Sequence, residues 1–219
     1  MHQAYVLRFL EDLQQHNSKA WMDAHRDRYL QAKSYFKELV EELLVQLRTI
    51  DPDLHATSTA ECLFRINKND FSKKGEAPYK GYFAAGISPG GRHSPLANYV
   101  LVLEPGNRSR AGGGIRKPTP AQLELIRQEI DYSPGDLEAI LAEPQMHEQF
   151  GGLQGVQQKA APRGYARSHP AIDLLRYKGY QVLHFFDDGE VQQPDFSSRL
   201  LPLYRQVVPL HTFLNRALT

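Results

Sequence analysis

Hydrophobic side chains in the first fifty residues recur at steps of three and four, the spacing of one face of an α-helix. One such stripe covers Ala4–His16, and a second runs from Lys19 to about Ile50. Asp51-Pro52 ends the second stripe, because the residue before a proline avoids helical geometry. The pattern therefore predicts a short helix followed by a long one.

The middle of the chain changes to short runs rich in β-branched and aromatic residues, separated by turn sequences. The expected strands are Cys62–Ile66, Tyr82–Ile87, Ala97–Leu103, Arg108–Ile115 and, further on, Lys178–Phe186. Because short turns join consecutive runs, antiparallel pairing is expected.

Helical signals return after the strands. Thr119 can cap a helix that starts at Pro120, with Gln122 completing a capping box. A C-terminal helical segment, Asp195–Leu218, contains Pro202 and Pro209, which should interrupt it. Segregated runs of helices and strands predict an α+β fold. We expect an antiparallel meander of about four to six strands, packed by a long N-terminal helix and C-terminal helices.

Composition favours one folded domain covering residues 1–219, since 41% of residues are hydrophobic and 23% are charged. The one cysteine, Cys62, excludes an intrachain disulfide and suits a reducing cytosol. Neither a secretory signal nor an apolar run of about 18 residues is present, so we expect a cytoplasmic protein without a membrane partner.

Charge is uneven along the chain although the net charge is only +1. Residues 64–118 carry 10 basic and 3 acidic side chains, whereas the flanking segments are mildly acidic. A basic segment attracts anions, although a solvated charged face would have the same composition.

Candidate ligand-binding residues gather in this basic segment. If residues 63–91 form a hairpin, Arg65 and Asn67 share one face and Tyr79 and Lys80 return beside them, with Asp70 adding a carboxylate. Guanidinium, ammonium and phenol groups that converge suit a carboxylate or a phosphate.

Two further pairs are candidates for the same site. Arg26 and Tyr29 share a helix face and either reach toward the ligand or belong to an ordinary amphipathic helix. Gly113 and Gly114 stand in a run of three glycines, which marks a ligand contact, a bulge or tight packing against a helix.

Catalysis would require a base, and His169 with Asp173 four residues later is the candidate pair. The alternative is a histidine that only makes structural hydrogen bonds. The histidine spacing does not match a metal site, and neither a P-loop nor a dinucleotide fingerprint is present, so we expect no metal and no cofactor.

Four sequence stretches together resemble a known family. They are Phe9–Tyr29, LFRIN…FS…PYKGYF, GGGIRKPTP…IRQEID and HPAIDLLRYKGY. Their combination is similar to the bacterial and fungal family of conserved hypothetical proteins labelled domain of unknown function 2461. The resemblance implies a single-domain protein and supplies no catalytic residues to transfer.

Three functions are compatible with the sequence. The first is a protein that either binds a small anionic or phosphorylated ligand or binds and also acts on it. The second is a nucleic-acid-associated protein whose basic segment contacts phosphates. The third is a non-catalytic interaction or structural domain. Whether the protein is an enzyme stays open.

Overall fold

The computed structural model describes residues 2–68 and 76–219. The chain divides into two compact units. Unit 1 comprises Met1–His93, Val100–Ala111 and Phe185–Pro202, and unit 2 comprises Ser94–Tyr99, Gly112–His184 and Leu203–Thr219. The expectation of a single domain over residues 1–219 stays a prediction.

The described residues form one sheet of four antiparallel strands in the order β1-β2-β3-β4. The strands are β1 (Phe83–Ile87), β2 (Asn98–Leu103), β3 (Ser109–Ile115) and β4 (Tyr180–Phe186). Neighbouring strands in the sheet are consecutive in sequence, so the sheet is a meander. The predicted α+β class and antiparallel sheet are confirmed.

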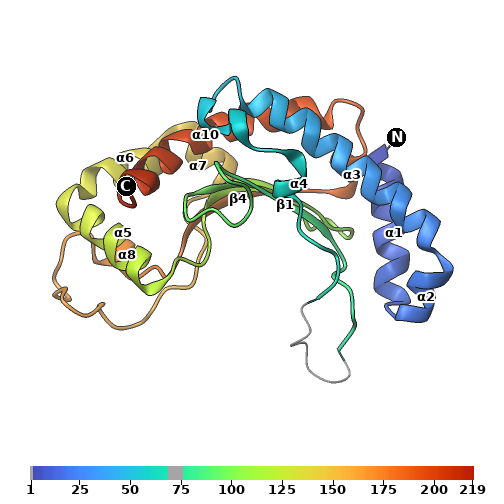
Figure 1. The fold of residues 1–219 in the computed structure, drawn as a ribbon. Coiled ribbons are helices and arrows are strands. Elements are labelled where there is room, and N and C mark those ends of the chain that lie inside the picture. The colour runs from blue at the N-terminus through green and yellow to red at the C-terminus, as the bar shows by residue number, and fades with distance from the viewer. Residues whose placement is uncertain (1, 69–75) are drawn as a thin grey trace. The chain divides into compact units, whose positions relative to one another are not determined.

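Unit 1 contains the N-terminal helices. They are α1 (His2–Gln15), α2 (Lys19–Ala24), α3 (Arg26–Leu47), the 3-10 helix η1 (Pro52–Ala56), α4 (Thr59–Cys62) and, later, α9 (Asp188–Val191). In Figure 1, α1 and α3 lie side by side. The Phe83 ring of β1 stacks on Phe9 of α1 and on Phe36 of α3, with centroid distances of 6.3 and 5.4 Å. Burial of these aromatic rings therefore joins both helices to the sheet within unit 1.

The long helix predicted from Lys19 to Ile50 is two helices in the structure. Ser18 caps the first, accepting a hydrogen bond from the backbone N–H of Trp21 at 3.2 Å. The break lies at His25, with φ −117° and ψ 27°, and its ring stacks on Trp21 at 4.2 Å. Both helices carry apolar residues at helical spacing, so the pattern alone did not separate them.

The predicted strand Cys62–Ile66 is wrong. Ser58 and Glu61 form a capping box that starts α4, and this helix ends at Cys62. Leu63 then makes an isolated antiparallel bridge to Ala85. A short apolar run fits the end of a buried helix as well as it fits a strand.

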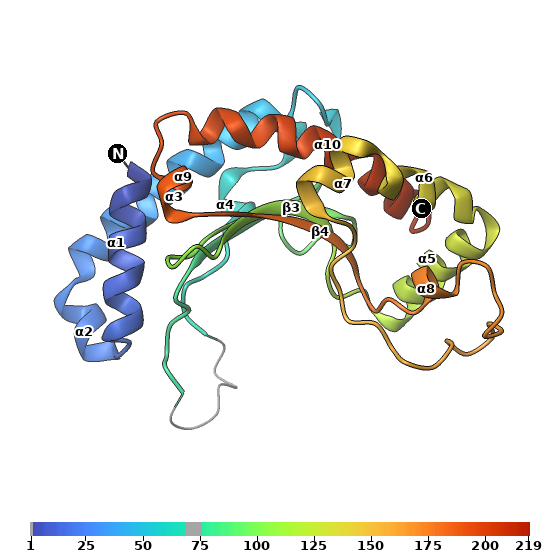
Figure 2. The ribbon, with the colours of Figure 1, turned by 180° about the vertical axis from the view of Figure 1, so that it is seen from behind.

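Unit 2 contains α5 (Pro120–Tyr132), α6 (Pro134–Ala142), α7 (Pro144–Phe150) and α8 (Ile172–Leu175). Figure 2 shows α8 beside α5. The predicted capping box is confirmed, because Thr119 Oγ1 accepts from the Gln122 N–H at 3.2 Å and Gln122 Oε1 accepts from the Thr119 N–H at 2.8 Å.

The C-terminal segment forms one helix, α10 (Phe196–Arg216), whose residues up to Pro202 belong to unit 1 and whose later residues belong to unit 2. The predicted interruption at Pro202 and Pro209 is therefore wrong. Both prolines are solvent-exposed, while apolar residues such as Leu210 are buried on the other face of the helix. Burial of that face outweighs the backbone hydrogen bonds that the prolines remove.

Among the helices of the described residues, none has both the length and the apolar character that crossing a membrane would require.

Candidate functional site

The candidate site starts from a narrow antiparallel pairing in unit 1. Asn67 forms a bridge with Tyr79, the Lys80 N–H donates to Ile66 O at 2.8 Å, and the Lys68 N–H donates to Pro78 O at 2.9 Å. Figure 1 shows the two paired segments running side by side. Tyr79 and Lys80 thus return beside residues 65–67, which is the pairing that a hairpin predicts.

The other edge of Tyr79 is closed by Asn17, which follows α1. Asn17 Nδ2 donates to Tyr79 O at 2.9 Å, and the Tyr79 N–H donates to Asn17 Oδ1 at 3.0 Å. One side chain therefore satisfies both backbone groups of Tyr79. These two hydrogen bonds fix the position of the Tyr79 backbone relative to the end of α1.

A groove of about 500 Å³ lies along this pairing within unit 1. The described residues that line it are Gln14, Asn17, Lys68, Ala77, Tyr79, Lys80, Gly81, Tyr82, Glu104 and Arg108. Three of the lining side chains are cationic and one is a carboxylate. Tyr79 and Lys80 are the two predicted ligand-binding residues that line it.

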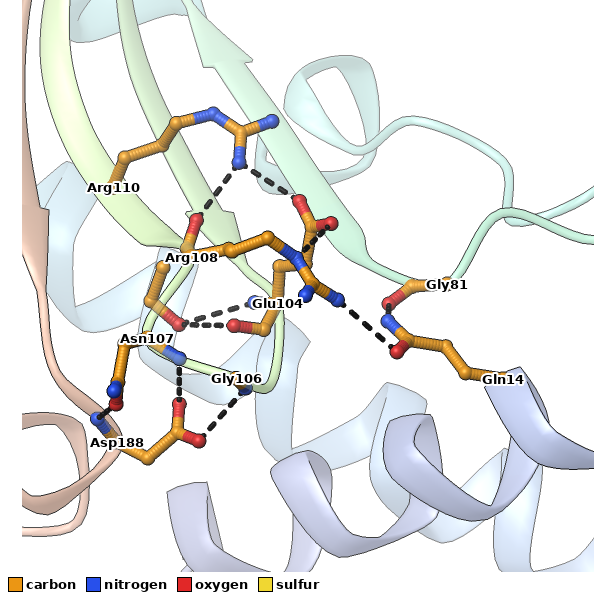
Figure 3. A network of polar contacts seen from close by, with 9 residues as sticks. Gln14, Gly81, Glu104, Gly106, Asn107, Arg108, Arg110 and Asp188 are labelled. Atoms are coloured by element: carbon orange, nitrogen blue, oxygen red, sulfur yellow. Dashed lines mark hydrogen bonds and ion pairs between the residues drawn. The ribbon is translucent and has the colours of Figure 1, made fainter.

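The carboxylate, Glu104, is held by two arginines (Figure 3). Arg108 Nε donates to Glu104 Oε1 at 2.9 Å, and Arg110 Nη1 donates to Glu104 Oε2 at 2.8 Å. The Glu104 side chain is 17% exposed, so its charge is largely compensated by these arginines and not by water. Two guanidinium groups on one carboxylate leave an excess of positive charge beside the groove.

Arg108, just before β3, is also hydrogen-bonded to Gln14 of α1, and Gln14 in turn is hydrogen-bonded to Gly81 (Figure 3). Its Nη2 donates to Gln14 Oε1 at 3.1 Å, and Gln14 Nε2 donates to Gly81 O at 2.8 Å. A Cβ on Gly81 would lie 2.6 Å from Gln14 Cγ, so the absence of a side chain at Gly81 is what lets Gln14 approach. The groove wall is therefore a connected set of hydrogen bonds from three separate segments.

The turn before Arg108 is fixed by Asp188 of α9. Asp188 Oδ2 accepts from the Gly106 N–H at 2.8 Å and Oδ1 accepts from the Asn107 N–H at 3.2 Å, while Asn107 Oδ1 accepts from the Asp188 N–H at 2.9 Å. These bonds hold Asn107 at φ 59°, a left-handed conformation that few residues other than glycine adopt. The turn leads from β2 into β3, and Arg108 is the last residue before β3.

Lys80 has a different environment from an ordinary surface lysine. Its Nζ donates to Arg65 O at 2.8 Å and lies 5.8 Å from the centroid of the Phe64 ring. Burial, and next the positive charge of Arg65, lower the pKa of the Lys80 ammonium from its usual value. Arg65 itself is exposed, as is Asn67, and neither lines the groove.

Comparison with family models identifies the wider group of this protein. The model described as Conserved hypothetical protein (DUF2461) matches residues 5–213. The chain belongs to this family. Neither a search of curated proteins nor a search of solved structures finds a match. The resemblance in the sequence is confirmed, and the chemistry of this DUF2461 protein has to be inferred from its own side chains.

Tyr29 lies near both Arg26 and Tyr79, and neither Arg26 nor Tyr29 is among the described residues that line the groove. Burial raises the pKa of the Tyr29 hydroxyl; Arg26 lowers it, and the neighbouring Tyr79 raises it further. Tyr29 also packs its ring against Phe83 at 6.4 Å. Tyr29 therefore packs against β1 within unit 1, and a direct contact with a ligand stays a prediction.

Gly113 and Gly114 belong to unit 2, whereas the described groove residues belong to unit 1. A Cβ on Gly113 would lie 2.4 Å from His211 Nε2, and a Cβ on Gly114 would lie 2.1 Å from Tyr180 O. Close approach of α10 accounts for Gly113, as the alternative of packing against a helix predicted, whereas the backbone of β4 accounts for Gly114. A ligand contact at either one stays a prediction.

His169 and Asp173 also lie in unit 2, and they have different partners. His169 Nε2 contacts Asp131 Oδ1 at 2.8 Å, and His169 Nδ1 accepts the Ala171 N–H at 3.1 Å. Asp173 pairs with Arg176 at 3.0 Å. Because both ring nitrogens of His169 are engaged, it would have to release a partner before it could act as a base.

The groove residues that sequence reasoning missed include Gln14, Asn17, Lys68, Glu104 and Arg108. The signal for Arg108 was present, since Glu104 precedes it by four residues within the basic segment. Asp70 lies outside the described residues. In the part of the chain that the structure describes, no three His, Cys, Asp or Glu side chains gather as a metal site would require.

Proposed function

We propose that the groove of unit 1 binds a small anionic or phosphorylated ligand. The observation that carries this proposal is the charge of the described lining: it contains Lys68, Lys80 and Arg108, and its carboxylate, Glu104, is already bound by two arginines. An anion would relieve the repulsion between these cations and gain charge-assisted hydrogen bonds.

The groove also offers the shape that such a ligand needs. A volume of about 500 Å³ is in the range of small-molecule sites. The Tyr82 ring forms part of the lining, and the guanidinium of Arg110 lies 5.9 Å from its centroid. A ligand with an anionic group and a short organic body could therefore contact cations and an aromatic ring together.

The test is a thermal-shift and calorimetric titration of the full chain with inorganic phosphate, a sugar phosphate and a nucleoside monophosphate. A ligand present at a free concentration of about 100 times its Kd should raise the free energy of unfolding by about 2.7 kcal/mol. The variants Lys80→Gln and Arg108→Gln should lose this stabilisation, whereas Lys178→Gln, which changes an exposed lysine of unit 2, should retain it.

Two results would contradict the proposal. One is the absence of stabilisation by every anion in the set. The other is stabilisation that persists unchanged in Lys80→Gln and Arg108→Gln. A short oligonucleotide whose affinity falls steeply with salt, alongside no response to small anions, would instead support nucleic-acid binding.

We also propose that the protein is cytoplasmic. Cys62 is free and buried, which suits a compartment where thiols remain reduced. Fractionation of cells that express the tagged chain tests this location.

A further inference from the structure

The environment of Lys80 holds its amine in one orientation. Lys80 is partly buried, and its Nζ donates to the backbone oxygen of Arg65 at 2.8 Å. This acceptor can bind an N–H of either the ammonium or the neutral amine. In the neutral amine, the bond to Arg65 O uses one hydrogen and leaves the nitrogen lone pair available.

The positive charges around Lys80 disfavour the protonated form of its amine. Arg65 lies beside it, and Lys68 and Arg108 line the same groove. The acidic member of the lining, Glu104, is paired with Arg108 and Arg110. Among the described residues, Lys80 makes no ion pair with a carboxylate. A partly buried lysine next to another cation is the arrangement that activates an amine as a nucleophile.

We propose that Lys80 is a nucleophilic amine that captures an aldehyde or ketone bearing an anionic group, and this proposal rests on the proposed function of the groove as an anion site. The cations bind the anionic group and thereby place the carbonyl carbon beside Lys80 Nζ. The lowered pKa of Lys80, caused by burial and by Arg65, is consistent with this role.

The reaction balances without an oxidant or a reductant. The Nζ lone pair forms a C–N bond to the carbonyl carbon while the C=O π bond breaks, and one amine proton is transferred, through solvent, to the oxygen to give a carbinolamine. The C–O bond then breaks, and the hydroxyl group leaves as water with the second amine proton, so that a C=N bond forms and a neutral imine remains. Because imine formation releases water, the product hydrolyses again when the ligand is removed.

The experiment uses pyridoxal 5′-phosphate as the anionic aldehyde and sodium borohydride, added as an assay reagent, to reduce the imine to a stable amine. Peptide mapping by mass spectrometry then locates the modified lysines. We expect Lys80 to be modified several-fold faster than Lys19, an exposed lysine whose pKa is raised by its hydrogen bond and charge interaction with Asp23 at 2.9 Å. Equal modification of Lys80 and Lys19 would overturn the proposal.

Two related compounds separate the anion site from the amine. Pyridoxal lacks the phosphate and should modify Lys80 several-fold more slowly. Pyridoxamine 5′-phosphate carries the phosphate but no aldehyde, so it should bind and slow the modification. If it binds in an Arg108-dependent way while Lys80 stays unmodified by the aldehyde, the proposed function stands and this inference fails. If neither phosphate compound binds, the proposed function fails as well.

Variants supply the remaining controls. Lys80→Arg keeps a cation in the groove, so it should retain the binding of pyridoxamine 5′-phosphate and lose the modification. Lys178→Arg should behave as the wild type. Arg65→Gln should move the pH midpoint of Lys80 modification upward, because it removes the neighbouring charge. An unchanged midpoint in a folded Arg65→Gln protein would contradict the role assigned to Arg65.

Discussion

Acid should destabilise unit 2 through a single buried histidine, His211. The residue lies on α10 with 4% exposure, and its ring centroid is 4.3 Å from that of Tyr99. Its Nε2 faces Gly113 and has no hydrogen-bond partner in the described part of the chain. Burial lowers the pKa of His211 to about 3, opposed by a hydrogen bond with the backbone of Asn98.

The magnitude follows from the difference between the two states. In the unfolded chain the imidazole takes up a proton below its ordinary pKa of about 6.5, whereas in the folded chain it stays neutral down to about pH 3. The unfolded state therefore binds more protons in this window, and the free energy of unfolding falls as the pH falls. The loss is about 1.4 kcal/mol per pH unit, or about 2 kcal/mol at pH 5.

The assay is urea-induced unfolding followed by circular dichroism at pH 7 and pH 5. His211→Gln removes the titrating group and keeps an amide N–H that can donate to Asn98. It should lose about 2 kcal/mol less than the wild type on acidification. His55→Gln, at an exposed histidine of unit 1, should lose as much as the wild type. An equal pH dependence in His211→Gln and the wild type would refute the reasoning.

Three further changes test the packing and the groove. Gly113→Ala should lower the free energy of unfolding by about 1–3 kcal/mol because the added Cβ would overlap His211, whereas Gly135→Ala, with no atom within 4 Å of its Cβ, should not; urea titrations measure both. Glu104→Gln removes the carboxylate found among the described residues of the groove lining and should raise the affinity for phosphate about fivefold, or about 1 kcal/mol, in calorimetry; a weaker affinity would argue against an anion site. Cys62, whose pKa is raised to about 11 by burial, should react slowly with a thiol reagent at pH 8, where about one thiol in a thousand is ionised, and rapidly in urea; fast reaction of the folded protein would contradict its burial.

Local signals were enough to predict much of the fold. The Thr119 capping box and the strands around the Glu104–Asn107 turn depend on a few neighbouring residues, and the structure contains them. The errors arise where packing decides. The Cys62–Ile66 run is apolar in either conformation, and α10 continues through Pro202 because its opposite face is buried.

The candidate site was predicted in part for the same reason. Arg65 and Lys80 are 15 residues apart, and a hairpin brings them together. Arg108 is hydrogen-bonded at the groove to Gln14, which lies 94 residues earlier in the chain. Neither the turn residues nor the charge pattern predicts a contact between residues so far apart in sequence. Sequence periodicity indicates which face a side chain occupies, but it does not indicate which distant segment meets that face.

The carboxamide of Asn17 has a consequence for self-association. Exposed backbone N–H and C=O groups on an extended segment are a template for a strand from another molecule. Asn17 binds both of these groups on Tyr79, so it takes the place of one residue of a neighbouring strand. The side chain that positions the groove therefore also closes this edge to intermolecular β-pairing.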